Sequence, residues 1–268
     1  MELLHIIVVS VMQGITEFLP ISSWAHLIMI PKLTGWPDHG IQIEAAVHVG
    51  TLLAVALYLW RDVAQMLRGL FLLFVGRWTP GARLLFLLIA ATIPVVAAAL
   101  LFREHINAAR HNLALIGWAM LVFGILLYVG DKRFMTLRKM EHVGFTHALA
   151  LGLAQAVALL IPGASRSGVT MTAARFLAFE REDAARLSLL LSIPVGIGQA
   201  VLIGREIYQS GDLALRTDAL LALGLAFACA LLAIAGMMAW LRRAGFTPFV
   251  IYRIVVGVGL LYWAYAIG

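Results

Sequence analysis

Polar side chains gather in two short stretches of an otherwise apolar chain, and the first of them contains five polar residues of interest. Gln13 and Glu17 are four residues apart, so a helix places them on one face. The proline that follows ends that helix, and Ser22 or Ser23 can cap the next one. His26 follows Ser23 by three residues, so these two side chains share a face of the second helix. Serine and histidine are the residue types needed for nucleophilic attack and proton transfer.

The second polar stretch is Pro-Gly-Ala-Ser-Arg-Ser-Gly-Val-Thr at 162–170. Arg166 is its only charge, and no other charged residue or histidine lies between His147 and Arg175. An arginine inside an apolar segment is costly unless an anion or a carboxylate pairs with it. The free backbone N–H groups at the start of a helix also favour an anion. We expect that anion to contact a turn-forming glycine, three hydroxyls and the guanidinium: Gly163, Ser165, Ser167, Thr170 and Arg166.

Together the two stretches predict a site for a phosphate or a diphosphate. The second stretch would bind its oxygens, and Gln13 and Ser22 are further candidates for contact with it. Glu17, with Gln13, is expected to hold a divalent cation, because Mg²⁺ prefers a carboxylate together with phosphate oxygens and water. Structural alternatives stay open at this point. Glu17 and Arg166 can form an ion pair that only links the two stretches, and His48 reads as a core or cavity-lining residue.

The composition places these stretches in a membrane protein. Hydrophobic residues make up 62% of the 268 and charged residues only 13%, against about a quarter in a soluble domain. This composition argues against a soluble enzyme, a disordered protein and a nucleic-acid binder. The apolar runs are long and continuous, which favours helices over an outer-membrane barrel. With a single cysteine, Cys229, the chain cannot form an internal disulfide.

Six segments are long and apolar enough to cross a bilayer. They lie near residues 43–60, 84–102, 113–130, 188–208, 218–240 and 249–267. Two further apolar stretches, 3–31 and 147–172, are each interrupted by a proline and small polar residues, which predicts re-entrant helical hairpins. Arg253, near the start of the last span, is expected to be a flanking residue that reaches the membrane surface.

The two interrupted stretches resemble each other. Residues 13–23 align without gaps to residues 155–165, and Gln13 falls on Gln155. Three predicted spans follow each hairpin, and a unit with an odd number of spans repeats with inverted topology. We therefore expect one integral membrane domain with a first repeat at 1–130 and a second at 142–268.

Basic residues predict the orientation. The loops 61–83, 131–146, 173–187 and 241–248 carry 13 Lys or Arg, against 4 in the loops 32–42, 103–112 and 209–217. The positive-inside bias places the first set in the cytoplasm. The first hairpin then enters the membrane from outside and the second from the cytoplasm, so their tips are expected to meet near its middle.

The chain resembles the undecaprenyl-diphosphate phosphatase family, also called the bacitracin-resistance protein family. The resemblance is carried by Gln-Gly-Ile-Thr-Glu-Phe-Leu-Pro-Ile-Ser-Ser-x-x-His at 13–26, by the stretch at 162–170 and by Pro-Phe-Val-Ile-Tyr-Arg at 248–253. It implies hydrolysis of undecaprenyl diphosphate to undecaprenyl phosphate and inorganic phosphate. That reaction recycles the lipid carrier for cell-wall synthesis and gives bacitracin resistance. The resemblance also implies a site that opens to the outer side of the cytoplasmic membrane and that uses Mg²⁺ or Ca²⁺.

The chain departs from the family at one position of the acidic motif, which normally places two carboxylates four residues apart. Glu17 keeps the second carboxylate, and Gln13 occupies the first position. An amide can still coordinate a cation, but it cannot act as a base, so the departure gives Glu17 more weight. The family's serine, histidine, Ser-Arg and threonine positions fall on Ser23, His26, Ser165, Arg166 and Thr170.

Two mechanisms fit these residues. In one, Ser23 attacks the terminal phosphorus, Glu17 or His26 takes its proton, and Arg166 stabilises the transferring group. In the other, a water activated by the cation or by His26 attacks directly, and Ser23 only orients it. We therefore assign Glu17, Ser23, His26 and Arg166 as catalytic.

Rival functions come from other classes. Inverted repeats with broken helices also suit a transporter or a flippase for a polyprenyl phosphate. A lipid phosphatase with a histidine nucleophile would need a histidine where Thr172 stands. A purely structural subunit would leave the cost of the buried charges unexplained. The expected partners are a polyprenyl diphosphate lipid and the membrane, with no nucleic acid; a homodimer is compatible with a sequence that does not fix the oligomeric state.

Overall fold

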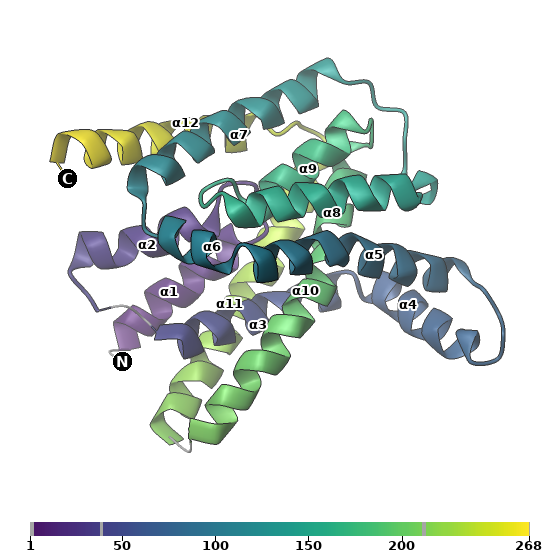
Figure 1. The fold of residues 1–268 in the computed structure, drawn as a ribbon, viewed down its shortest axis with the longest axis horizontal. Helices are drawn as coiled ribbons and strands as arrows, with labels where there is room; N and C mark the ends of the chain where they lie inside the picture. The colour runs from purple at the N-terminus through teal and green to yellow at the C-terminus, as the bar shows by residue number, and fades with distance from the viewer. Residues whose placement is uncertain (1–2, 38–39, 211–212, 268) are drawn as a thin grey trace.

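The computed structural model describes residues 3–37, 40–210 and 213–267, with side chains for all of these except 41, 199, 202–216 and 267. The described chain is helical and has no named strand, only an isolated bridge between Arg138 and Phe179. The helices in Figure 1 are α1 (Leu3–Thr16), α2 (Ser23–Thr34), α3 (Gly40–Tyr58), α4 (Trp60–Leu73), α5 (Pro80–Leu101), α6 (Arg103–Ala109), α7 (Leu113–Arg133), α8 (Phe145–Leu160), α9 (Arg166–Phe176), α10 (Arg181–Ser210), α11 (Leu213–Leu241) and α12 (Thr247–Tyr262). An all-helical fold is thus confirmed for the described residues.

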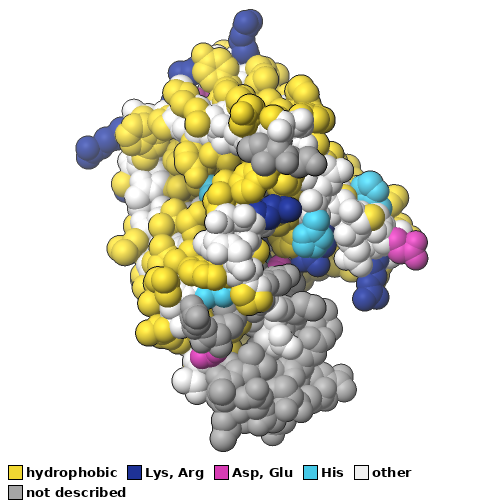
Figure 2. Space-filling model, turned by 90° about the vertical axis from the view of Figure 1, so that its left-hand side faces the viewer, with side chains coloured by type: hydrophobic (Ala, Val, Ile, Leu, Met, Phe, Trp, Pro, Cys, Tyr) yellow, Lys and Arg dark blue, Asp and Glu magenta, His cyan; other side chains and the backbone are white. Residues whose placement is uncertain are grey.

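Membrane-spanning helices account for most of the predicted spans. Among the described residues, α5, α7, α11 and the stretch from α12 to residue 266 are long and apolar enough to cross a membrane. The predicted span 43–60 coincides with α3, which meets α4 at an angle of 86°. The predicted span 188–208 falls within α10, whose side chains from residue 202 onward lie outside the described residues, as do those of Arg216 and most of the loop 209–217. Figure 2 shows many hydrophobic side chains exposed over the described part of one face of the molecule.

The two interrupted stretches fold as pairs of helices, α1 with α2 and α8 with α9. Their breaks lie at 17–22 and 161–165, and each break ends on a serine with a positive backbone angle φ, 73° at Ser22 and 69° at Ser165. A positive φ is strained for a residue with a Cβ atom. When the two stretches are aligned by the starts of their second helices, Ser22 therefore corresponds to Ser165. The gapless sequence alignment instead places Ser23 on Ser165.

Helices of one half of the chain pack against helices of the other half. Helix α1 packs on α11, α8 on α5, α7 on α12, and α3 on both α10 and α11. Small residues permit this close approach. A Cβ atom on Gly14 would lie 2.6 Å from the Cβ of Cys229, and one on Gly152 would overlap the backbone of Ala91. The hairpins are thereby held between helices that lie far from them in the sequence.

Arg253 of α12 joins the two breaks. Its guanidinium is fully buried and donates hydrogen bonds to the carbonyl oxygen of Pro20 in the first break (3.3 Å) and to those of Gly163 (3.2 Å) and Ala164 (2.9 Å) in the second. It also donates to two carbonyls of α7, at Ala119 and Met120. The prediction that Arg253 flanks the membrane surface was wrong. The carbonyl oxygens freed by both breaks need a hydrogen-bond donor, and the Arg253 side chain supplies it in place of a backbone N–H group.

Candidate active site

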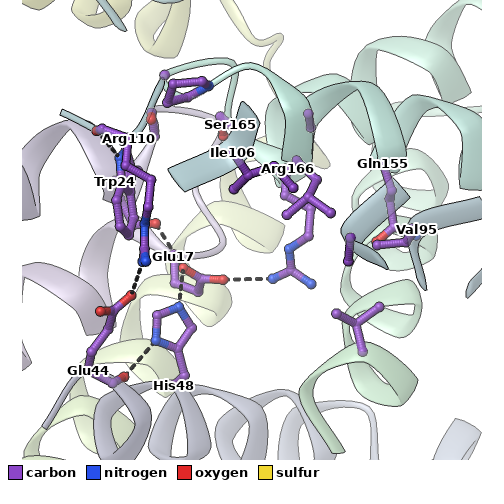
Figure 3. Close-up of a pocket in the computed structure, with 18 of the residues that line it drawn as sticks. Glu17, Trp24, Glu44, His48, Val95, Ile106, Arg110, Gln155, Ser165 and Arg166 are labelled. Carbon is purple, nitrogen blue, oxygen red and sulfur yellow. Dashed lines mark hydrogen bonds and ion pairs between the residues drawn. The ribbon is translucent and has the colours of Figure 1, made fainter. Parts of the chain in front are cut away.

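A pocket of about 420 Å³ lies where the two breaks meet (Figure 3). Six of the residues predicted from the sequence line it: Glu17, Ser22, Ser23, Gly163, Ser165 and Arg166. The pocket wall is completed by residues of α3, α5, α6, α8 and α10. The structure therefore brings the tips of both hairpins to one cavity, as the sequence predicted.

Glu17 is the centre of the polar network in this pocket. Its Oε1 atom accepts a hydrogen bond from Arg166 Nη2 at 2.7 Å, which also makes an ion pair. Its Oε2 atom accepts one from Ser23 Oγ at 2.8 Å and one from Gln13 Nε2 at 2.8 Å. Only 10% of the Glu17 side chain is exposed. A carboxylate this buried is stabilised by the guanidinium and the two neutral donors, and it is placed to receive a proton from Ser23.

His48 also points into the pocket, from α3 (Figure 3). Its Nδ1 donates to the carbonyl oxygen of Glu44 at 2.7 Å, and its Nε2 lies 3.2 Å from Gln13 Nε2 and 3.8 Å from Glu17 Oε2. From the sequence, His48 could be either a core residue or a cavity-lining residue. In the structure it lines the cavity, and 26% of its side chain is exposed. An imidazole inside an apolar span was the signal that gives it weight.

Besides Gln13, three predicted site residues lie outside the pocket lining. The buried His26 donates from Nδ1 to the carbonyl of Ser22 (2.7 Å) and accepts at Nε2 from the hydroxyl of Tyr252 (2.6 Å). Ser167 donates to the carbonyl of Leu19 at 2.9 Å. Thr170 is bonded to the carbonyl of Arg166 and to the hydroxyl of Ser188. In this structure these side chains fix the two breaks and do not face the cavity.

Gln13 is fully buried and reaches the site only through its amide. Its nitrogen bonds Glu17, and its Oε1 atom has no hydrogen-bond partner. A buried oxygen of this kind needs a partner that the protein itself does not supply. Within the described residues no group of three or more His, Cys, Asp or Glu is arranged for a metal ion. The oxygen donors Glu17 and Gln13 nevertheless fit a hard divalent cation that takes its remaining ligands from phosphate and water.

Gln155, the sequence counterpart of Gln13, lines the opposite wall of the pocket (Figure 3). It is buried, and neither its amide nitrogen nor its amide oxygen has a partner. Buried amides without partners are rare in folded proteins. Gln155 was used in the sequence analysis only to define the repeat, and its unpaired amide now makes it a candidate substrate contact.

The mouth of the pocket is basic and was not predicted from the sequence. Helix α6 contributes Arg103 and Asn107 to the lining, and Arg110, which directly follows the helix, also lines the pocket. The Arg110 guanidinium lies over the ring of Trp24, 4.5 Å from its centre, and 3.5 Å from the carboxylate of Glu44. Two arginines at the entrance raise the local concentration of an anionic headgroup.

The chain is similar to known proteins over nearly its whole length. A family profile described as bacitracin resistance protein BacA matches residues 6–259. The chain is 50% identical to "Undecaprenyl-diphosphatase 1" of Rhodospirillum rubrum over 99% of this chain and 96% of that protein. It is 49% identical to "Undecaprenyl-diphosphatase" of Ruegeria pomeroyi over 99% of this chain and all of that protein. With nearly its whole length matched, the chain belongs to the bacitracin resistance protein family.

Proposed function

We propose that this protein hydrolyses undecaprenyl diphosphate to undecaprenyl phosphate and inorganic phosphate. Relatives named for this activity cover 99% of the chain at 48–50% identity. The observation that carries the proposal is the Glu17 carboxylate held between Ser23 and Arg166 at 2.8 and 2.7 Å in a membrane-embedded pocket. This arrangement offers a nucleophile, its base and a guanidinium for phosphate oxygens within one network.

In the proposed reaction Ser23 Oγ attacks the terminal phosphorus and gives its proton to Glu17. The new Oγ–P bond forms as the bridging P–O bond breaks, and undecaprenyl phosphate leaves with the electron pair of that bond. Arg166 and the donors at Ser165 stabilise the charge on the transferring group. Glu17 passes its proton to the departing undecaprenyl phosphate and then takes a proton from water, which attacks the phosphoserine. As the Oγ–P bond breaks, Ser23 Oγ regains the proton from Glu17 and inorganic phosphate is released. Direct attack by water, with Ser23 as an orienting group, is the competing route.

His26 has a supporting place in this scheme. It bonds the carbonyl of Ser22, the residue before Ser23, and so fixes the start of α2. Its part in proton transfer stays a prediction, because its Nε2 faces Tyr252.

A divalent cation, Mg²⁺ or Ca²⁺, is part of the proposal. Glu17 and the unpartnered Oε1 of Gln13 are the residues that would hold it. When bound, such a cation neutralises charge on the diphosphate.

We also propose the finer architecture expected from the sequence: six spans and two re-entrant hairpins in inverted repeats at 1–130 and 142–268. It is supported by matching packing, since each hairpin's first helix lies against the second span of the other half, α1 on α11 and α8 on α5. The charge bias supports a pocket that opens to the outer side of the inner membrane, where α6 forms its mouth. A homodimer stays a prediction.

The test is phosphate release from undecaprenyl diphosphate by the purified chain in detergent. We expect release that a chelator suppresses and that Arg166→Ala lowers by about 10²–10³-fold, because the guanidinium contacts developing charge. Arg133→Ala, an exposed arginine at the far end of α7, is the matched control and keeps full activity. Lipid binding or translocation without phosphate release would favour the transporter or flippase, and activity equal in Arg166→Ala would refute the site.

A further inference from the structure

Three side chains that can each offer a lone pair meet beside the pocket: Glu17 and His48 line it, and the buried Gln13 contacts both. Gln13 Nε2 lies 2.8 Å from Glu17 Oε2 and 3.2 Å from His48 Nε2, and the last two atoms are 3.8 Å apart. Figure 3 shows the imidazole of His48 directed at Glu17. The three groups come from α1, the first break and α3, so the fold and not the local sequence creates this triangle.

The tautomer of His48 is fixed by its own helix. Nδ1 lies 2.7 Å from the carbonyl oxygen of Glu44, one turn earlier, and a carbonyl only accepts. Nδ1 therefore carries the proton, and the lone pair of Nε2 points into the pocket. A backbone carbonyl that orients the far nitrogen in this way is the usual support of a metal-binding histidine.

The Gln13 amide has two possible orientations with different chemistry. As placed, its NH₂ group bridges the two acceptors, Glu17 Oε2 and His48 Nε2, while its oxygen is buried without a partner. Turning the amide by half a revolution would bring three lone pairs together, which is favourable only around a cation. A glutamate at this position could not donate in the first arrangement. The amide thus suits a site that alternates between a filled and an unfilled state.

The spacing and the donor types indicate which cation. Neighbouring ligands of an octahedral ion with bonds of about 2.1 Å lie about 3.0 Å apart. The two sides of this triangle that meet at Gln13 are close to that spacing, at 2.8 and 3.2 Å, and the third side is longer, at 3.8 Å. Arg166 occupies the other oxygen of Glu17, so Oε2 is the one that faces the triangle. Imidazole nitrogen is a poorer ligand for Mg²⁺ and Ca²⁺ than for first-row transition metals.

We propose that His48 is a third protein ligand of the cation site, and that it shifts the preference of this chain from Mg²⁺ and Ca²⁺ toward Mn²⁺. The inference rests on the cation included in the proposed function, but it concerns binding and can be tested without turnover.

The experiment uses the full chain in detergent and Mn²⁺ alone. Electron paramagnetic resonance counts free Mn²⁺ during a titration, competition with Mg²⁺ and Ca²⁺ gives the preference, and pulsed measurements detect ¹⁴N coupled to bound Mn²⁺. We expect one bound Mn²⁺ per chain, displaced by Mg²⁺ only at concentrations about tenfold higher or more. We also expect a ¹⁴N coupling that His48→Gln abolishes and that the exposed control His111→Gln keeps.

A wild-type protein that binds no Mn²⁺, or binds it without ¹⁴N coupling, would overturn the inference, and neither result depends on whether a variant folds. A coupling that persists in His48→Gln would overturn it as well. Phosphate release is measured on the same wild-type sample. Bound Mn²⁺ with ¹⁴N coupling but no hydrolysis would remove the proposed function and leave the ligand assignment standing.

Discussion

At the level of single residues, the question is whether the Glu17–Arg166 pair is a structural link or part of a catalytic site. A buried ion pair is weak evidence for stability, because desolvation offsets much of its attraction. Here the same carboxylate also accepts the hydroxyl of Ser23, and all three side chains line one pocket. A purely structural link would need neither the hydroxyl nor the cavity, so the arrangement favours chemistry.

The two candidate nucleophiles give different trapped species. In the serine route phosphoserine at position 23 is an intermediate, and His26→Ala is the variant in which to trap it. Loss of the His26 hydrogen bond to Ser22 is expected to slow turnover without removing Glu17, Ser23 or Arg166. We expect ³²P from terminally labelled substrate to remain on this protein after acid quenching, and Ser23→Ala to abolish the label. Ser23→Cys with unchanged activity and no label in His26→Ala would leave direct attack by water as the mechanism.

At the level of elements, each hairpin breaks at a serine whose backbone is strained. Ser165 offsets its positive φ by accepting a hydrogen bond from Gly168 N at 3.1 Å, which caps α9. Ser22 has the same backbone sign but makes no cap, and its buried hydroxyl has no partner. Strain without local compensation is typical of functional sites.

Replacing each serine by glycine isolates the value of the cap. Both substitutions relieve a similar positive φ and add similar freedom to the unfolded chain. Only Ser165→Gly loses a cap, which costs about a few tenths of a kcal/mol when glycine takes the N-cap position, together with a 3.1 Å hydrogen bond to the hydroxyl of Ser167. We expect Ser22→Gly to be the more stable of the two by that amount, measured as a difference in thermal unfolding in detergent. Equal midpoints, or the opposite order, would show that the Ser165 cap contributes nothing.

Arg253 links both breaks to α7. Its five carbonyl acceptors belong to both breaks and to α7. Arg253→Met keeps most of the volume but leaves the buried carbonyls unpaired, at a cost on the order of 3 kcal/mol. We expect a lower unfolding midpoint and reduced phosphate release together. The exposed Arg243→Met is the control, and a stable, fully active Arg253→Met would contradict this role.

At the level of the whole molecule, local patterns predicted more than long-range ones. Apolar length and prolines located both breaks and the four helices of the described residues that are long and apolar enough to cross a membrane, because these features depend on neighbours in sequence. Helices α4 and α6 lie in segments that were expected to be loops. Glu17 and Arg166 are isolated charges in apolar segments, and an unpaired charge is too costly there. Their contact could therefore be predicted from the sequence. The role of Arg253 was predicted wrongly because its partners Pro20 and Gly163 lie far from it in the sequence. The role of His48 was left open for the same reason, since it contacts Gln13. The mouth formed by α6 was missed for the same reason, as its arginines also suit a membrane flank.

Orientation can be measured on the intact membrane with a single reactive cysteine. Cys229 is the only native cysteine, so Cys229→Ala gives a clean background. Exposed positions for new cysteines exist at the start of α1 (Leu4), the end of α2 (Leu33), on α6 (Glu104) and at the end of α7 (Arg133). We expect a membrane-impermeant maleimide to label the first three on the outer side of spheroplasts and the last only after permeabilisation. Leu4→Cys and Leu33→Cys form the decisive pair, because a re-entrant hairpin puts both on one side and a crossing segment puts them on opposite sides. Labelling of only one of them from outside would exclude the re-entrant hairpin, whereas labelling of both only after permeabilisation would keep it and reverse the orientation of the pocket.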